Sequence, residues 1–357
     1  MSLDLSFLPE SIRPKAEELS KDIDFFATNS KGSNGYVLFG FNKILKRRVV
    51  VKFYYWGGGD HAEPALLASF NSQHILTIDH AESINEDDAF FMTPYCALGD
   101  LDDALNNRKF GPVEAIDVIS QIAAGTSFLH GSGHLHRDLK PSNIFCVSEN
   151  RFVIGDFGSV VAHNNEGYAK TLTKHSLLYR PPEEIQESRF YREGDIYQLG
   201  FIFYQTLGGS LPYDERDWLK DKQREKYDGL ARLDRQAYAT SIIEEKIGKG
   251  KMLKVSSLPP WTPASLIKII RKCCAKARTD RYSSVADLTA VLNNIRSRIP
   301  DWRICEFPVL HRAKKKYRVI PYKGNFAIEK CVGTKWRREH SYSVSIIDEA
   351  IRIAETL

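Results

Sequence analysis

Three separate stretches of the sequence carry polar side chains of types that can do chemistry. Lys52 ends an apolar run of three valines, Asp138 and Asn143 lie in the decapeptide Leu135–Ile144, and Asp156 follows 13 residues after Asn143. An ammonium group at the end of an apolar strand needs a charged partner, because the inward face of the strand excludes water. Carboxylate and amide oxygens without histidine or thiolate ligands suit a hard cation such as Mg²⁺. These residue types therefore indicate a site for an anion and a hard cation.

A glycine-containing segment reads Ser-Lys-Gly-Ser-Asn-Gly-Tyr-Val from Ser30 to Val37, and Val37 lies 15 residues before Lys52. Glycines let a backbone fold over phosphates with its N–H groups pointing inward. Ser30 stands where the pattern G-x-G-x-x-G-x-V has its first glycine. Two plainer interpretations stay open: a hairpin turn for this segment, and a lysine that reaches water from the strand end for Lys52.

The decapeptide Leu-His-Arg-Asp-Leu-Lys-Pro-Ser-Asn-Ile resembles the catalytic loop of eukaryotic-type protein kinases at every diagnostic position. The resemblance runs from about residue 24 to 298, and the Lys-Pro-Ser sequence is typical of serine/threonine kinases. It implies that Asp138 accepts the proton of the substrate hydroxyl, that Lys140 neutralises the γ-phosphate and that Asn143 holds Mg²⁺. His136 is implied to be a packing residue rather than a base.

The tripeptide Asp-Phe-Gly that starts at Asp156 resembles the Mg²⁺-binding tripeptide of the same family. It implies that Asp156 chelates the Mg²⁺ between the β- and γ-phosphates and that Phe157 packs under a helix. Lys52 is implied to bind the α- and β-phosphates and to pair with a glutamate, for which Glu63 is the best candidate. Proline is tolerated only in the first helical turn, so Pro64 predicts a helix that begins at Glu63 or just before. Whether the Lys52–Glu63 pair forms without a regulator stays open.

The resemblance implies a nucleotide pocket made by the glycine-containing segment, nearby strands and the hinge between two lobes. Its expected residues are Ser30, Gly32, Ser33, Gly35, Val37, Val50, Lys52, Thr93, Tyr95, Cys96 and Asp100. Thr93 would guard the space behind the adenine, and Asp100 would lie near the ribose. ATP and Mg²⁺ are the implied cofactors.

The sequence Tyr-Arg-Pro-Pro-Glu, which ends at Glu183, resembles the end of a kinase activation segment with proline in place of alanine. It implies a buried ion pair between Glu183 and Arg281. Ser176 is implied to contact the catalytic loop through its hydroxyl, and Asp195 is implied to brace the backbone of that loop.

Arg137, directly before Asp138, is implied to pair with a phosphate on the activation segment. Thr171 and Thr173 lie at about the right place, which predicts autophosphorylation at one or both. The alternative is that residues 163–174 form a loop that is ordered without phosphorylation.

The elements that would position these residues follow two patterns. Runs of β-branched and aromatic residues at 36–41 and 48–55 predict a hairpin within a strand-rich lobe over residues 24–97. Apolar residues at helical spacing predict a helical lobe over residues 98–298. Residues 1–23 are expected to form a leader. The predicted fold class is α+β, with the two lobes of a protein kinase.

Residues 299–357 are predicted to form an accessory module. Three strand patterns and an amphipathic helix over 345–355 resemble a small βββα module of bacterial proteins that has no assigned function, which indicates a bacterial source. Residues 301–357 hold 12 Lys/Arg and 7 Asp/Glu, so this segment carries the whole net charge of +5. A protein-docking role is expected, with nucleic-acid binding as the competing idea and a solvated face as the plainest interpretation.

The composition is that of a soluble globular protein, with 43% apolar and 27% charged residues. The six cysteines form no CxxC pair, so reduced thiols and a cytoplasmic location are expected. The first residues lack an apolar core of signal-peptide length, and no apolar stretch approaches the roughly 18 residues of a membrane span.

Three other functions compete with a protein serine/threonine kinase. The first is an inactive kinase fold that serves as a scaffold. Against it, the sequence retains Lys52, Asp138, Asn143 and Asp156. The second is a phosphotransferase for small molecules, against which Ser176 and the Pro-Pro-Glu segment argue, because they favour protein substrates. The third is a binding protein that acts through its basic tail, and this role is compatible with kinase activity.

Overall fold

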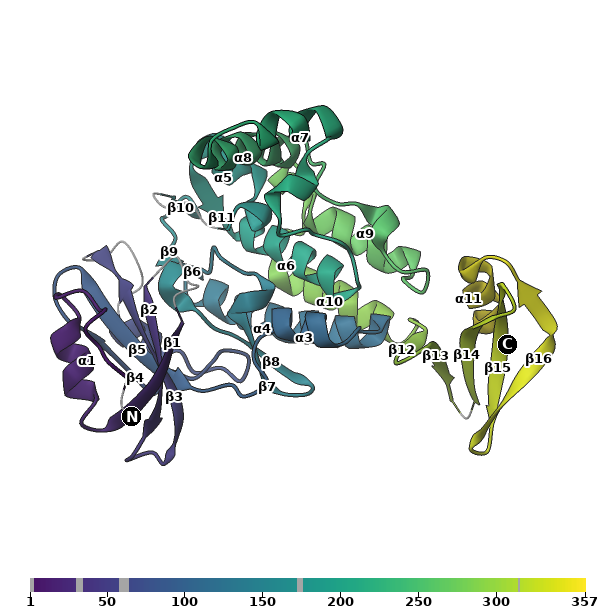
Figure 1. The fold of residues 1–357 in the computed structure, drawn as a ribbon, viewed down its shortest axis with the longest axis horizontal. Helices are drawn as coiled ribbons and strands as arrows, with labels where there is room; N and C mark the ends of the chain where they lie inside the picture. The colour runs from purple at the N-terminus through teal and green to yellow at the C-terminus, as the bar shows by residue number, and fades with distance from the viewer. Residues whose placement is uncertain (1–2, 30–34, 58–63, 172–175, 314) are drawn as a thin grey trace.

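The computed structural model describes residues 3–29, 35–57, 64–171, 176–313 and 315–357. A strand-rich lobe, a helical lobe and a second sheet with one helix follow one another along the long axis of the molecule (Figure 1). The predicted α+β class with two lobes is confirmed. Among the described residues, no helix is both long enough and apolar enough to cross a membrane.

The strand-rich lobe is built on a five-stranded antiparallel sheet with the order β1-β2-β3-β5-β4. Its strands are β1 (Ile23–Asn29), β2 (Tyr36–Asn42), β3 (Arg47–Tyr55), β4 (His80–Ser83) and β5 (Asp88–Pro94). The hairpin expected from the sequence corresponds to β2 and β3.

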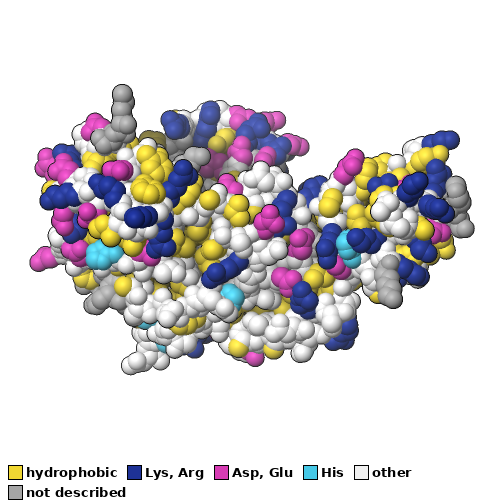
Figure 2. All heavy atoms as spheres, turned by 90° about the horizontal axis from the view of Figure 1, so that it is seen from below, with side chains coloured by type: hydrophobic (Ala, Val, Ile, Leu, Met, Phe, Trp, Pro, Cys, Tyr) yellow, Lys and Arg dark blue, Asp and Glu magenta, His cyan; other side chains and the backbone are white. Residues whose placement is uncertain are grey.

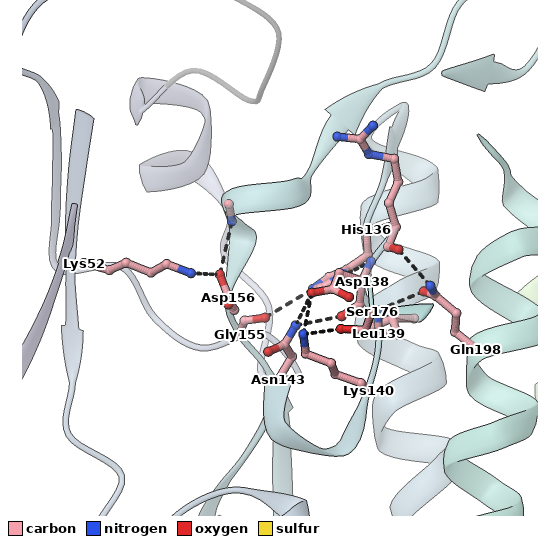
Figure 3. A network of polar contacts seen from close by, with 12 residues as sticks. Lys52, His136, Asp138, Leu139, Lys140, Asn143, Gly155, Asp156, Ser176 and Gln198 are labelled. Atoms are coloured by element: carbon pink, nitrogen blue, oxygen red, sulfur yellow. Dashed lines mark hydrogen bonds and ion pairs between the residues drawn. The ribbon is translucent and has the colours of Figure 1, made fainter. Parts of the chain in front are cut away.

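Strand β3 separates the core of this lobe from the active site. Successive side chains of a strand point to opposite faces, and Val49, Val51 and Phe53 are buried in one core cluster. The alternate residue Tyr54 belongs to a second cluster that continues into the helical lobe. Lys52 shares that second face, which directs its ammonium group toward the helical lobe (Figure 3).

The leader expected over residues 1–23 packs against the sheet of the strand-rich lobe. Its helix α1 (Arg13–Leu19) and the residues before it pack on the outer face of the strands, where Leu8, Ile12 and Ala16 are at most 3% exposed. The backbone N–H of Leu3 also donates to Phe25 in β1 at 3.0 Å. The leader therefore closes the core of the strand-rich lobe.

The helical lobe centres on α4 (Pro112–Gly131) and α6 (Arg192–Thr206), which pack against each other and are mostly buried. The surrounding helices are α3 (Leu101–Asn107), α5 (Pro182–Glu187), α7 (Asp221–Asp228), α8 (Arg232–Gly248), α9 (Ala264–Cys273) and α10 (Val285–Arg296), whereas α2 (Pro64–Ser69) belongs to the strand-rich lobe and contacts β4 and β5. Three two-stranded sheets carry the loops of the site: β6 (His134–Leu135) with β9 (Val161–Ala162), β7 (Ile144–Ser148) with β8 (Arg151–Ile154), and β10 (Tyr168–Lys170) with β11 (Arg189–Tyr191).

The C-terminal module is a five-stranded antiparallel sheet in sequence order, followed by one helix. Its elements are β12 (Asp301–Ile304), β13 (Pro308–Arg312), β14 (Lys315–Tyr322), β15 (Asn325–Val332), β16 (Lys335–Val344) and α11 (Ile347–Thr356). The prediction of three strands was therefore too low. Strands β12 and β13 hold only 4 and 5 residues, and β13 begins at Pro308, a residue type that argues against a strand in a sequence pattern.

Trp302 in β12 joins this module to the helical lobe. Its side chain is fully buried in the core under α11. Its carbonyl oxygen lies so close to Gly111, ahead of α4, that a Cβ added at Gly111 would come within 1.7 Å of it. Trp261 of the helical lobe also packs against the module core. The module is thus docked at the end of the helical lobe that faces away from the strand-rich lobe (Figure 1).

Candidate active site

The catalytic loop between β6 and β7 is held by two buried side chains of α6. Asp195 accepts the backbone N–H of His136 at 3.0 Å and that of Arg137 at 2.9 Å. Gln198 accepts the N–H of Leu139 at 2.8 Å and donates to the carbonyl of Arg137 at 2.7 Å. Asp195 and Gln198 are both fully buried. Buried polar groups of this kind fix the backbone because an unmade hydrogen bond is costly there.

Asp138, Lys140, Asn143 and Ser176 lie together (Figure 3). The Lys140 ammonium lies 2.8 Å from Asp138 Oδ2 and 2.7 Å from Ser176 Oγ. The Asn143 amide nitrogen donates to the Asp138 carbonyl at 2.7 Å and contacts Oδ2 at 3.2 Å. The other oxygen, Asp138 Oδ1, is buried without a hydrogen-bond partner among the described residues. Asp138 therefore keeps one acceptor oxygen free for a further donor.

His136 is a packing residue, as the resemblance implied. Its side chain is fully buried, its Nε2 lies 3.2 Å from the carbonyl of Gly155, and its ring packs against Phe157 with centroids 6.3 Å apart. Burial lowers the pKa of His136 although nearby carboxylates oppose this shift. The neutral ring is therefore favoured.

Lys52 and Asp156 form an ion pair across the two lobes (Figure 3). Burial favours a higher pKa for Asp156, but the Lys52 ammonium outweighs it and holds the pKa below its ordinary value. Asp156 has a φ of 54°, in the left-handed region, and its Oδ1 also accepts the N–H of Gly158 at 3.4 Å. The carboxylate is therefore ionised and fixed by contacts from both sides.

Phe157 anchors the Asp-Phe-Gly turn. It is fully buried, with ring centroids 6.2 Å from Phe70 and 6.4 Å from Phe91. Leu67 of α2 belongs to the same cluster. Helix α2 is described from Pro64 to Ser69, so a start at Glu63 or just before lies outside the described residues.

Part of the predicted site falls outside the described residues. These predictions concern Ser30, Gly32, Ser33, Glu63 and Thr173. The Lys52–Glu63 pair and most of the glycine-containing segment therefore stay predictions.

The described residues of the predicted nucleotide pocket lie on β2, β3, β5 and the segment that follows β5. Val37 pairs with Lys52 in the register of β2 and β3, and Val50 pairs with Thr93 in that of β3 and β5. Gly35 has a φ of 123°, and a Cβ there would come within 1.9 Å of the Phe53 carbonyl. Only glycine fits this close approach.

The hinge residues connect β5 to α3. The N–H of Tyr95 donates to the Arg48 carbonyl at 3.2 Å, and Cys96 accepts the N–H of Gly99 at 3.1 Å. Burial raises the pKa of the Cys96 thiol, so it stays protonated. Asp100 is the N-cap of α3 and accepts the N–H of Asp103 at 2.9 Å.

The Glu183–Arg281 ion pair expected from the sequence is present and bidentate. The two Nη atoms of Arg281 lie 2.7 and 2.8 Å from the two carboxylate oxygens of Glu183. The Arg281 guanidinium also lies 4.8 Å from the ring centroid of Tyr197 in α6. This pair ties the end of the activation segment to the body of the helical lobe.

Arg137 and Thr171 lie close to each other beside the activation segment. Arg137 donates through Nε to the Ser159 carbonyl at 2.8 Å and reaches the Lys170 carbonyl at 3.4 Å. Burial lowers the pKa of Arg137 to about 10, so the guanidinium stays charged at neutral pH. The Thr171 hydroxyl is buried and has no hydrogen-bond partner in the described part of the chain.

Several residues of the site were not predicted from the sequence. Gln198 lies three residues after Asp195 and so shares its helix face, which was an available signal. No sequence pattern indicated a role for Glu184. This residue is 1% exposed, and its carboxylate lies 3.5 Å from Arg180 Nε and has no hydrogen bond among the described residues. Burial raises the pKa of Glu184 to about 7, against the opposing effects of Arg180 and Arg137.

A groove of about 320 Å³ opens beside the catalytic loop. It is lined by Lys140, Pro141 and Ser142 of that loop, by residues 176–179, and by Asp102 and Tyr213. The Tyr213 hydroxyl donates to Asp102 at 2.7 Å and so closes one side of the groove. Lys140, which lines the groove, also contacts Asp138, so the groove lies next to that carboxylate.

The oxygen ligands present fit a Mg²⁺ ion shared with a nucleotide. No group of three His, Cys, Asp or Glu side chains within the described ranges could hold a metal alone. Mg²⁺ at such sites needs only one or two carboxylates, since phosphates and water supply the other ligands. Asp156 provides a carboxylate, and the Asn143 amide nitrogen is turned toward Asp138, which leaves the amide oxygen to act as a ligand.

Comparison with known proteins identifies the family. A family model described as protein kinase domain matches residues 31–293. The interferon-induced, double-stranded RNA-activated protein kinase of Mus musculus is 36% identical over 121 residues, which cover 33% of this chain and 24% of that protein. The 3-phosphoinositide-dependent protein kinase B of Dictyostelium discoideum is 30% identical over 222 residues, which cover 57% of this chain and 24% of that protein.

A bacterial protein is among the similar proteins. The probable serine/threonine-protein kinase PknB of Lactococcus lactis is 28% identical over 183 residues, which cover 51% of this chain and 26% of that protein. The chain thus spans about a quarter of the length of these relatives. Because the family model covers most of the chain and includes the catalytic loop, this chain belongs to the protein kinase family.

Proposed function

We propose that this chain transfers the γ-phosphate of ATP to serine or threonine hydroxyls of proteins. The observation that carries the proposal is the state of Asp138: one carboxylate oxygen is held by Lys140, and the other is buried and has no hydrogen-bond partner within the described part of the chain. An incoming hydroxyl would satisfy this free oxygen, which has the position and the charge to accept its proton.

The residues around Asp138 then have distinct roles. Asp138 orients the hydroxyl and takes its proton as the new O–P bond forms and the bond between the β- and γ-phosphates breaks, with ADP as the leaving group. Lys140 would neutralise the charge on the γ-phosphate oxygens. Ser176 would help to position the substrate segment, because its hydroxyl shares the Lys140 ammonium.

Nucleotide binding would use both lobes. Asp156 and Asn143 would hold Mg²⁺, which neutralises negative charge on the phosphates when bound. Lys52 would exchange part of its contact with Asp156 for the α- and β-phosphates. The adenine would be covered by Val37, Val50 and the segment after β5. We also propose domain boundaries at residues 24, 98 and 299.

Two competing functions are less well supported. A scaffold without activity would not need an ionised Asp156 paired with Lys52, or a free acceptor oxygen on Asp138. A phosphotransferase for small molecules would not need the groove of about 320 Å³ that residues 176–179 line beside the catalytic loop. Protein substrates are therefore the favoured class, and a cytoplasmic location stays part of the proposal.

The test measures phosphate transfer from labelled ATP with Mg²⁺ to the chain itself and to a generic protein substrate. We expect Asp138→Asn and Asp156→Ala to lose several orders of magnitude of activity, since positioning and charge stabilisation supply most of the acceleration. Asp217→Asn, an exposed change on the same lobe, should keep it. Transfer that persists in both site variants would contradict the proposal, and phosphotyrosine as the product would contradict the serine/threonine assignment.

We further propose autophosphorylation of the activation segment at Thr171 or Thr173. Arg137 supports this, because its buried guanidinium already contacts the carbonyl of Lys170, next to Thr171. A phosphate there would form charge-assisted hydrogen bonds with Arg137. Mass spectrometry of active protein should find at least one of these threonines modified, and activity should rise with the modification.

The C-terminal module is proposed to bind a partner. It lies on the side of the helical lobe away from the strand-rich lobe (Figure 1), so an occupant would not block the catalytic loop. A deletion from Asp301 onward should leave a chain that still binds ATP and should change which substrates it modifies.

A further inference from the structure

The face of the C-terminal sheet that points away from α11 carries a row of arginines. The register places Arg303 opposite Val309, Val309 opposite Arg318, Arg318 opposite Glu329, and Glu329 opposite Arg338. Residues paired in this way share one face of a sheet. The row therefore crosses all five strands, from β12 to β16.

The chain neighbours of this row show which face it occupies. Trp302, Leu310, Tyr317, Val319 and Ile328 alternate with it and are buried in the core under α11. The arginines consequently project from the opposite, uncovered face. Strands lie about 4.8 Å apart, so Arg303, Arg318 and Arg338 recur at intervals of about 10 Å over about 19 Å.

Two of these guanidinium groups lie over aromatic rings. Arg338 lies 3.5 Å from the ring centroid of Tyr322, and Arg318 lies 4.6 Å from that of Trp336. Stacking reduces the conformational freedom that a long side chain loses on binding. It also covers the two rings, so they are not free to stack on unpaired bases.

Charge is distributed unequally between the two sides of the module. Lys316 also lies on the uncovered face and is exposed, whereas α11 carries three of the seven acidic residues. Arg303 and Arg318 each pair with one acid of their own face, Asp301 and Glu329. Four cations and two acids leave the face positive, and Lys and Arg side chains are visible on this part of the surface (Figure 2).

We propose that this arginine row is a docking face for duplex DNA. Its positive charge and its width suit a double-stranded polyanion, and the covered aromatic rings disfavour a single strand, which binds by stacking. A five-stranded sheet is wider than the two-stranded ribbon that the major groove of B-form DNA admits, so the cations would contact the phosphates of the duplex and would not enter a groove. The inference deepens the proposed partner-binding role of the module and changes the expectation from a protein partner to a nucleic acid.

The test uses the full chain and a labelled 20-base-pair duplex DNA in a fluorescence anisotropy titration at 50 and 200 mM NaCl. Four phosphate contacts give a slope of about −3.6 in log affinity against log salt, which corresponds to a loss of about 150-fold between these concentrations. Arg303→Gln/Lys316→Gln removes two cations from the uncovered face. It should weaken binding at least about tenfold and halve the slope.

The matched control is Lys315→Gln/Lys330→Gln, which removes the same charge from the same module. Lys330 pairs with Tyr317, and Lys315 lies two residues before Tyr317, so both residues belong to the face that α11 covers. This variant should bind within about threefold of the wild type. Equal weakening in both variants would overturn the proposal, because binding would then depend on net charge and not on the row.

A competition assay distinguishes among the ligands that could occupy the arginine row. Duplex RNA, single-stranded DNA and a polyglutamate peptide should each compete less well than duplex DNA, and a better competitor among them would refute the proposed occupant. Absence of DNA binding at 50 mM NaCl would refute it as well.

Phosphate transfer is a separate readout. Arg303→Gln/Lys316→Gln should retain phosphate transfer, and Asp138→Asn should retain DNA binding, so the failure of one proposal is distinguishable from the failure of the other.

Discussion

The carboxylate of Asp195 accepts the backbone N–H of Arg137 at 2.9 Å while Arg137 adopts a φ of 69°, in the left-handed region. A non-glycine residue in this region costs of order 1–3 kcal/mol and persists only where its surroundings hold it. Asp195 is completely buried, and its hydrogen bond stabilises this backbone conformation of Arg137. Because Arg137 precedes Asp138, the hydrogen bond sets the direction of the proposed catalytic carboxylate.

Replacement of Asp195 by asparagine should therefore disturb the catalytic loop. The amide presents one acceptor where the carboxylate has two, and its NH₂ group would face a backbone N–H. We expect the free energy of unfolding to fall by about 2–3 kcal/mol and kcat to fall up to about 100-fold through misplacement of Asp138. Urea unfolding and steady-state kinetics measure both effects, with the exposed Asp217→Asn as a control that should change neither.

The buried Glu183–Arg281 pair should contribute far more to stability than a surface pair. Glu183→Gln leaves a guanidinium whose side chain is 0% exposed without its counter-charge, so we expect a loss of about 3–5 kcal/mol. Asp117→Asn removes the exposed partner of Arg296 and should cost less than about 1 kcal/mol. A pair of urea titrations compares them, and similar losses would show that burial does not decide the contribution.

The buried Glu184 predicts a stability that falls as the pH rises. Its folded-state pKa of about 7 exceeds the ordinary value of 4.5, so between these values the unfolded chain releases a proton that the folded chain retains. The resulting penalty grows from pH 4.5 to 7 and is constant above. Glu184→Gln should thus be more stable than the wild type at pH 8, by up to about 3 kcal/mol, with a smaller difference at pH 5.

Thermal or urea unfolding at the two pH values tests this prediction. Glu166→Gln, at an exposed position, serves as the control and should show no such pH dependence. A constant difference between Glu184→Gln and the wild type at pH 5 and 8 would mean that Glu184 is ionised in the folded state at both.

The leader should contribute to the stability of the strand-rich lobe. Ile12 is 3% exposed against the sheet, and its replacement by alanine should lower the free energy of unfolding by about 2–4 kcal/mol, as for other buried aliphatic side chains. Glu17→Ala on the exposed side of α1 should change it by less than about 0.5 kcal/mol. If the two variants unfold at the same urea concentration, the leader is not part of the cooperative core.

The sequence by itself determined the family, most of the fold and the chemical identity of the candidate site. The catalytic loop and the Asp-Phe-Gly turn are contiguous, so their residue types and spacing are visible without a structure. Periodicity likewise predicted the hairpin of β2 and β3 and the helical lobe over residues 98–298. Local patterns of this kind reflect local constraints, namely the alternation of strands and the 3.6-residue turn of helices.

Only the tertiary structure decided how those local pieces are held. Gln198 accepts the N–H of Leu139, which lies 59 residues earlier in the sequence. Glu184 is buried because α5 packs against the rest of the helical lobe, and the sequence of α5 alone does not indicate this burial. The packing of the leader and the row from Arg303 to Arg338 likewise depend on strand register and on contacts between distant segments. Burial and register are properties of the assembled chain, because a side chain loses water or gains a cross-strand neighbour only when remote segments meet.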